Sequence, residues 1–181
     1  MRLLIAPALL ATLLGGCDAE GTGPTDVTRL LSAANPAVQL RAGQSLPFSG
    51  SCVMTFDAPP FPIPPIITQT DVGECKLSHL GHSTVVSVQS INLASGTQTG
   101  RRTYTAANGD QLHMTHVGTS GPAGPGLVRF QATATIIGGT GRFTGATGEV
   151  RGQGVANLVT RTTIVSMEGT ISYEASDRGK R

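Results

Sequence analysis

The stretch Leu127–Ile137, LVRFQATATII, decides the fold class. Apolar residues occupy its even positions from 128 to 136, and polar residues occupy the odd positions from 129 to 135. Successive side chains of a strand point to opposite faces, so this alternation predicts a strand with one buried and one solvated face. The segment Arg161–Tyr173 repeats the pattern, with one face formed by Thr163, Val165, Met167, Ile171 and Tyr173.

Similar alternation covers most of the chain after Ala37. The expected strands are Ser45–Phe56, Gly73–Leu80, His82–Leu93, Thr99–Ala107, Asp110–Gly118, Leu127–Ile137, Gly148–Ala156 and Arg161–Tyr173. Long helical periodicity is absent from the sequence, and Gly accounts for 24 residues. Eight strands without a covering helix must close on themselves to hide their apolar faces and edges. We therefore predict an all-β fold: an eight-stranded antiparallel small β-barrel preceded by a signal peptide and a flexible tether.

The start of the chain has the features of a secretion signal. Arg2 precedes an apolar run over Leu3–Leu14, and Gly15, Gly16 and Cys17 follow. This run is shorter than the ~20 residues that cross a bilayer as a helix. The arrangement resembles the bacterial lipobox, which implies lipidation at Cys17 and an envelope lipoprotein facing the periplasm or the exterior. A lipid on Cys17 would anchor the protein to a membrane, which is therefore its expected partner.

The expected domain boundaries follow from these features. They are a lipoprotein signal peptide at 1–16, a lipidated N-terminus and tether at 17–36, a barrel domain at 37–175 and a polar tail at 176–181. Of three cysteines in the chain, Cys52 and Cys75 remain once Cys17 is assigned to the lipid. Two remaining cysteines in an oxidising compartment favour a disulfide between them. The alternative is a pair of buried, reduced thiols.

Composition argues against nucleic acid as a partner. The formal net charge is +2, and the aromatic residues are five Phe, two Tyr and no Trp. The glycine-rich segment Gly139–Gly145 lacks the following helix that a phosphate-binding loop requires. We interpret it as a turn in which Phe143 plugs one end of the barrel and Arg142 bonds to carbonyl groups or solvent.

Several segments between Gly73 and Tyr173 carry a family resemblance. They are SHLG at 78–81, TAANGD at 105–110, IGGTGRFTGATG at 137–148 and EGTISY at 168–173. In this order they resemble bacterial members of the allene oxide cyclase and dirigent barrel superfamily. The resemblance implies an eight-stranded barrel with a largely apolar interior, chemistry without a cofactor, and a candidate homo-oligomer, because plant relatives form trimers.

Enzymes of that superfamily rely on acidic and polar side chains inside the barrel. The predicted strands place almost no carboxylate at interior positions, which argues against catalysis by analogy. We therefore expect a barrel that holds a small apolar ligand or docks a partner. The alternatives are a cofactor-free cyclase or isomerase, and a structural envelope component.

The four histidines form two pairs, His79 with His82 and His113 with His116. Residues three apart on a strand point to opposite faces, so neither pair alone clamps a metal ion, and we expect no metal and no cofactor. If the more apolar face of each strand points inward, His113 lies outside the barrel. The candidate ligand pocket is then lined by His79, His82, Tyr104 and His116.

The segment Ala58–Ile67 is rich in proline. Proline fixes the backbone φ angle and lacks an N–H, so this segment is expected to be extended rather than helical or part of a central strand. Two interpretations remain open for it. It is either a lid or partner-docking strip over the mouth of the barrel, or a long loop packed on the outer wall.

Overall fold

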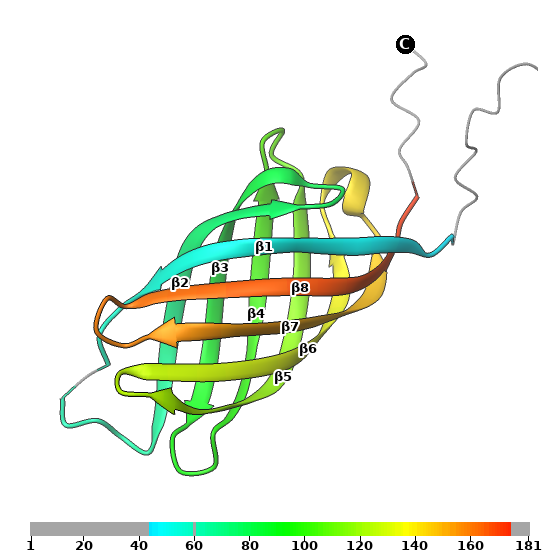
Figure 1. The fold of residues 1–181 in the computed structure, drawn as a ribbon. Helices are drawn as coiled ribbons and strands as arrows, with labels where there is room; N and C mark the ends of the chain where they lie inside the picture. Colours follow the sequence, from blue (N-terminus) through cyan, green and yellow to red (C-terminus); the bar gives the residue numbers. More distant parts are fainter. Residues whose placement is uncertain (1–43, 60, 175–181) are drawn as a thin grey trace, which may run out of the picture. The chain divides into compact units, whose positions relative to one another are not determined.

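The computed structural model describes residues 44–59 and 61–174. Eight strands close into one antiparallel barrel in the order β1 to β8, with β8 paired to β1 (Figure 1). The strands are β1 Leu46–Phe56, β2 Ile66–Leu77, β3 Gly81–Asn92, β4 Thr97–Ala106, β5 Gln111–Gly124, β6 Leu127–Gly139, β7 Thr147–Asn157 and β8 Thr162–Ser172. The predicted fold class is confirmed. Closure leaves no free sheet edge among the described strands.

Every strand pairs with its neighbour in the sequence, so the connections alternate between the two ends of the barrel. One end carries the connections β1–β2, β3–β4, β5–β6 and β7–β8, and we call it the open end. The other carries β2–β3, β4–β5 and β6–β7, together with the start of β1 and the end of β8, and we call it the plugged end (Figure 1).

A short 3-10 helix, η1 (Gly141–Phe143), fills the plugged end. The Phe143 side chain is fully buried and makes an edge contact with the ring of Tyr173. Arg142 Nη2 donates a hydrogen bond to the carbonyl of His79 at 2.7 Å. The interpretation of the glycine-rich segment as a turn carrying a plug and a carbonyl-binding arginine is therefore confirmed.

The disulfide between Cys52 and Cys75 is present and buried. The two residues are direct cross-strand partners in β1 and β2, and both side chains point into the barrel. This bond fixes which face of β2 is interior, because residues two and four positions away from Cys75 share its face.

Two strands differ from the prediction. β2 begins at Ile66 rather than Gly73, so the expected end of the proline-rich segment already belongs to a strand. In β3 the interior face carries Ser83, Val85, Ser87 and Gln89. The more apolar-looking face with Val86 and Val88 points to solvent, because the barrel interior holds a polar network that hydropathy does not anticipate.

The predicted signal peptide, the tether and Cys17 lie outside the described residues, as does the start of the barrel domain at Ala37. They stay predictions. Within the described ranges, no helix has the length and apolar character needed to cross a membrane.

Candidate functional site

A cavity of about 430 Å³ occupies the open end of the barrel. Its volume lies within the range of pockets that take small organic molecules. Apolar side chains from four strands and from the β7–β8 connection line its wall: Met54, Phe56, Ile67, Ile91, Val128, Phe130 and Leu158.

Small side chains make room for this cavity. Ala156 of β7 and Ser120 of β5 line its wall, where larger residues would fill the barrel. At the plugged end the interior positions carry Phe48, Leu112 and Ile171, which are completely or almost completely buried. The barrel is therefore packed at one end and hollow at the other.

Polar side chains from β2, β3 and β4 form the floor of the cavity. Asp71 is only 1% exposed, and its carboxylate accepts hydrogen bonds from the amide nitrogens of Gln69 at 2.9 Å and Gln89 at 2.8 Å. Asp71, Ser87 and Arg102 are successive cross-strand partners, so their side chains form one row across the interior. The interior of the open end thus carries one carboxylate, Asp71, which the sequence analysis did not assign to a site.

Arg102 supplies the opposite charge. Its side chain is 5% exposed, and its Nε donates to Ser87 Oγ at 3.4 Å. A buried cation is costly unless a neighbouring anion and hydrogen bonds compensate it. The charge of Arg102 acts on Asp71 across the row, and the Ser87 hydroxyl between them accepts the hydrogen bond from Arg102 Nε.

Burial raises the pKa of the Asp71 carboxyl above its ordinary value. The hydrogen bond from Gln69, the charge of Arg102 and the hydrogen bond from Gln89 act in the opposite direction but are outweighed. A carboxyl group of this kind exchanges its proton closer to neutral pH than an exposed aspartate does.

Gln98 is a cavity residue with unused hydrogen-bonding capacity. It lines the cavity and is 4% exposed, and its Nε2 has no hydrogen-bond partner among the described residues. A buried amide donor without a partner costs free energy. An oxygen atom on a bound molecule would satisfy this donor.

The structure does not bring the four predicted pocket residues together. His79 lies in the β2–β3 turn at the plugged end, where Nδ1 is 3.1 Å from the Tyr173 hydroxyl and Nε2 is 2.8 Å from the carbonyl of Pro47. His82 is exposed on the outer face of β3 and lies 3.6 Å from Glu74. Its predicted inward orientation is wrong, because β3 turns its other face to the interior.

Tyr104 and His116 do point into the barrel, below the floor of the cavity. The Tyr104 hydroxyl donates to Met167 Sδ at 3.4 Å, and His116 Nε2 lies 3.3 Å from Gln89 Oε1. Gly100 gives His116 its space, since a Cβ at that position would lie 2.7 Å from the imidazole. His113 faces outward next to Thr103, as expected.

Within the described residues no cluster of three or more His, Cys, Asp and Glu side chains is placed to hold a metal ion. The polar groups in and around the cavity are amides, hydroxyls, one carboxylate and one guanidinium. This set suits hydrogen bonding to an organic ligand better than metal coordination.

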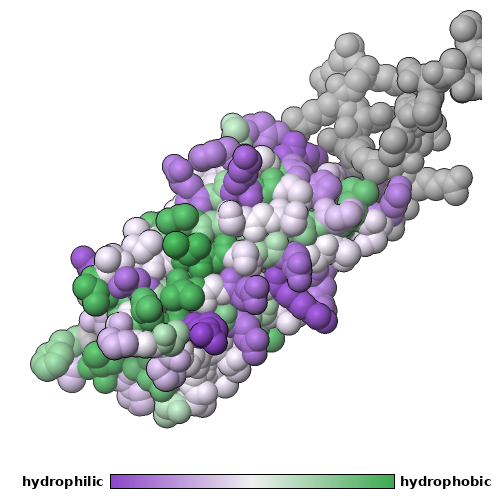
Figure 2. Space-filling model, in the orientation of Figure 1, coloured by the Kyte–Doolittle hydropathy of each residue, from purple (hydrophilic) through white to green (hydrophobic). Residues whose placement is uncertain are grey.

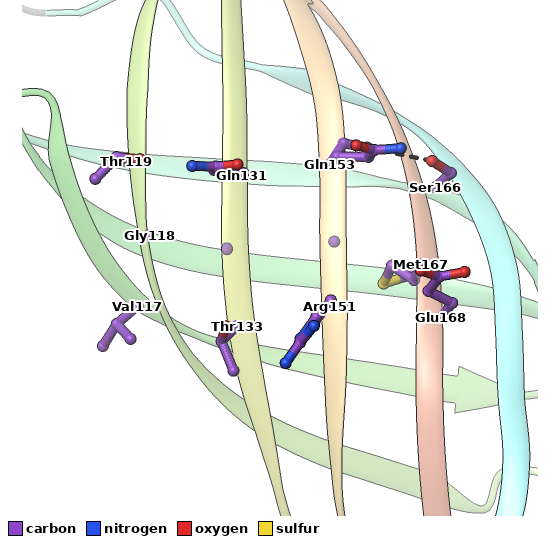
Figure 3. A pocket seen from close by; sticks show the side chains of 12 residues that line it. Val117, Gly118, Thr119, Gln131, Thr133, Arg151, Gln153, Ser166, Met167 and Glu168 are labelled. Carbon is purple, nitrogen blue, oxygen red and sulfur yellow. Dashed lines mark hydrogen bonds between the residues drawn. The ribbon is translucent and has the colours of Figure 1, made fainter.

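A second hollow of about 540 Å³ lies on the outer wall over β5 to β8 (Figure 3). Two rows of side chains border it, one containing Val117, Thr133, Arg151 and Glu168 and the other containing Thr119, Gln131, Gln153 and Ser166. All eight side chains are exposed. Water already satisfies such groups, so this groove offers a ligand less than the desolvated floor of the open end does.

Hydropathy missed Asp71 and its neighbours, although one signal in the sequence pointed to them. Asp71 lies four residues before Cys75, so an inward disulfide places Asp71 on the interior face once the strand is extended backward. The proline-rich segment concealed that extension, because its expected range reaches Ile67, beyond the start of β2 at Ile66.

The comparisons with known proteins support the fold. The barrel is similar to the solved structure of the pterocarpan synthase dirigent protein GePTS1, with a TM-score of 0.50 and 13% sequence identity. The similarity covers 77% of this chain and 90% of that chain. No protein-family model and no curated protein sequence matches the chain. At this identity the likeness extends to a dirigent-like barrel fold.

Proposed function

We propose that this protein binds a small, largely apolar molecule in the open end of its barrel and recognises an oxygen atom on that molecule. The observation that carries the proposal is the buried polar floor under an apolar wall. Gln98 offers a free donor there, and Asp71 and Arg102 lie in the same cavity. Ligand pockets commonly combine an apolar lining with a few convergent polar groups.

Titration of the full chain with the neutral fluorophore phenylnaphthylamine tests this function. We expect saturable binding at one site per chain. Ala156→Phe fills the cavity and should abolish the signal, because the added ring occupies the space of the probe. Val117→Phe adds the same ring to the outer groove and should leave binding unchanged. Equal binding by the wild type and Ala156→Phe would refute the proposal.

A cofactor-free cyclase or isomerase is the second candidate. The raised pKa of Asp71, set beside the cation of Arg102 in a largely apolar cavity, favours it, since these groups can transfer a proton and stabilise a developing negative charge. The similar solved barrel is described as a pterocarpan synthase, so the fold accommodates an enzyme.

Nitrobenzisoxazole is a suitable probe of this chemistry. A base removes its ring proton while the N–O bond breaks, and a coloured cyanophenolate forms. An enzyme of this kind should accelerate the ring opening, and the acceleration should rise with pH as Asp71 ionises and disappear in Asp71→Asn. Equal rates for the wild type and Asp71→Asn at every pH would refute the enzyme proposal and leave only the binding proposal standing.

We further propose that a lipid on Cys17 tethers the barrel to a membrane of the bacterial envelope. The apolar run before Cys17 and the small residues beside it support this proposal. Metabolic labelling with an alkyne fatty acid should mark the wild type and leave Cys17→Ala unlabelled. Equal labelling of both proteins would exclude this site.

A further inference from the structure

Apolar side chains on three of the four open-end connections are exposed to solvent. They are Phe61 and Ile63 in the β1–β2 connection, Leu93 in β3–β4, and Leu158 and Val159 in β7–β8, and we call them the apolar rim. Phe61 is 96% exposed and Val159 is 82% exposed. The proline-rich strip is therefore not packed on the outer wall at these positions. Clustered exposure of this kind marks an interaction surface.

The molecular surface shows the same distribution. Apolar side chains gather over the open end of the barrel, where β7 turns into β8, whereas much of the hydrophilic surface lies toward the plugged end (Figure 2). The rim residues come from three separate connections. A broad apolar partner would contact all three connections at once.

The backbone of the β7–β8 turn already has its hydrogen bonds inside the protein. Asn157 Oδ1 accepts from the N–H groups of Val159 at 2.9 Å and Thr160 at 3.1 Å. The N–H of Leu158 donates to the carbonyl of Gly126 at 2.8 Å. These donors can leave water without losing a partner.

The β3–β4 turn repeats this arrangement. Asn92 Oδ1 accepts from the N–H groups of Ala94 at 3.0 Å and Ser95 at 3.1 Å. The N–H of Leu93 donates to the carbonyl of Pro65 at 2.9 Å. In the β1–β2 connection, prolines at 59, 62, 64 and 65 have no N–H to satisfy.

Backbone donors that are bonded inside the protein, or absent as in proline, lower the cost of entering a lipid environment. A protein partner supplies hydrogen bonds of its own, whereas acyl chains supply none. The only charged residues in the described part of the four open-end connections are Asp57 and Arg161, whose charges cancel. The rim therefore matches an uncharged lipid surface rather than an anionic one.

We propose that the apolar rim inserts into the interface of a lipid bilayer, so that the cavity mouth opens toward the membrane and takes its ligand from it. This inference rests on the proposed binding function and specifies the ligand as an amphiphile that partitions into membranes. The rim would enter the boundary between headgroups and acyl chains, as interfacial segments do.

The length of the chain before the barrel permits this orientation. The described residues start at Gln44, near the plugged end. Residues 18–43 can span at most about 90 Å. The longest strand, β5, has 14 residues and is therefore about 46 Å long. A lipid on Cys17 and the apolar rim can thus reach the same membrane.

A single introduced tryptophan reports on the rim, because the chain has no Trp. Phe61→Trp places it in the rim, and Ala107→Trp places it in the β4–β5 turn at the plugged end. Both are made in the full chain carrying Cys17→Ser, so that a lipid on Cys17 does not contribute. With phosphatidylcholine vesicles that contain brominated acyl chains, we expect quenching and a blue shift for Phe61→Trp only. Quenching of neither reporter, or equal quenching of both, would overturn the proposal.

Vesicle cosedimentation in the same Cys17→Ser background measures the contribution of the rim. Val159→Ser should weaken binding about tenfold, as expected for losing one buried valine side chain. Val117→Ser is the matched control, since Val117 is equally apolar and well exposed on the barrel wall. Added salt should have little effect, because the rim carries no net charge. Equal binding by the two variants would contradict insertion of the rim.

Ligand binding by the cavity and membrane binding by the rim can be tested separately. Val159 does not line the cavity, so Val159→Ser should still bind phenylnaphthylamine in solution. Ala156→Phe should lose the fluorophore and still bind vesicles. Loss of vesicle binding in Ala156→Phe would contradict a rim that acts independently of the cavity. Self-association that depends on the rim, without vesicle binding, would overturn the membrane proposal and make the rim a contact between two copies of the chain.

Discussion

Inside the barrel, Gln89 Nε2 donates a hydrogen bond to Asp71 Oδ2 at 2.8 Å. The other end of this amide faces His116, with Gln89 Oε1 at 3.3 Å from the imidazole Nε2. A carbonyl oxygen accepts only, so neutral His116 carries its proton on Nε2. One glutamine thus connects the two buried groups whose pKa values are shifted.

His116 should make the stability of the protein depend on pH. Burial, with a smaller contribution from the charge of Arg102, lowers the pKa of His116 to about 4 from the ordinary value of 6.5. The unfolded chain therefore binds a proton first as the pH falls, and the stability present above pH 6.5 is lost between pH 6.5 and pH 4. The loss amounts to about 3 kcal/mol.

Denaturant unfolding of the wild type and His116→Gln across this window measures that loss. Glutamine keeps a donor toward Gln89 and does not titrate. The raised pKa of Asp71 acts in the opposite sense, since its contribution is present at low pH and is lost as the pH rises through that pKa. The difference between the two proteins isolates His116, and parallel stability curves would show that its pKa is not lowered.

Gln98 should make the cavity prefer a ligand with an oxygen atom. A naphthol and the matching methylnaphthalene differ only by a hydroxyl in place of a methyl group. We expect the naphthol to displace phenylnaphthylamine at about tenfold lower concentration, because it satisfies a buried donor. Gln98→Met keeps the volume and removes the amide, so the preference should disappear. An unchanged preference would assign recognition to Asp71 or Arg102 instead.

Phe143 should stabilise the barrel without affecting the cavity. Its ring is completely buried at the plugged end. Removing it in Phe143→Ala should cost about 3–5 kcal/mol in the free energy of unfolding. The affinity for phenylnaphthylamine at the open end should stay the same under conditions where the variant is folded. A matching loss of affinity would show that the two ends are coupled, and the exposed Thr144→Ala serves as the control.

The disulfide should stabilise the fold through the chain segment it closes. Cys52 and Cys75 are separated by 23 positions. In the chain-entropy description a loop of this length contributes about 3 kcal/mol. Replacing both cysteines with alanine should lower the free energy of unfolding by that amount, and a reductant should have the same effect on the wild type only. Equal stability of the wild type and the double alanine variant in the absence of reductant would contradict the prediction.

The sequence predicted much of the fold because local alternation determines it. Segments such as Leu127–Ile137 carry one apolar face, and hydropathy alone assigns that face to the core. The plug formed by Phe143 followed from the glycine-rich turn, and the disulfide followed from counting cysteines. The strands and the plug depend on a few neighbouring residues, and the disulfide depends only on which cysteines are present.

The candidate site could not be predicted in the same way. Asp71 and Gln89 are polar residues on interior faces, and they are tolerated there because they hydrogen-bond to one another. That compensation depends on the pairing of β2 with β3, which local hydropathy does not reveal. The histidine pairs attracted attention because of their spacing, yet His79 and His82 belong to the plugged end and the outer wall.

Native mass spectrometry of the full chain, purified from the cells that make it, tests the binding function most directly. The wild type should carry one small molecule per chain, and Ala156→Phe, with its cavity filled, should have the mass of the protein alone. The same bound mass on both proteins, or the mass of the protein alone for both, would contradict a ligand in the open end of the barrel.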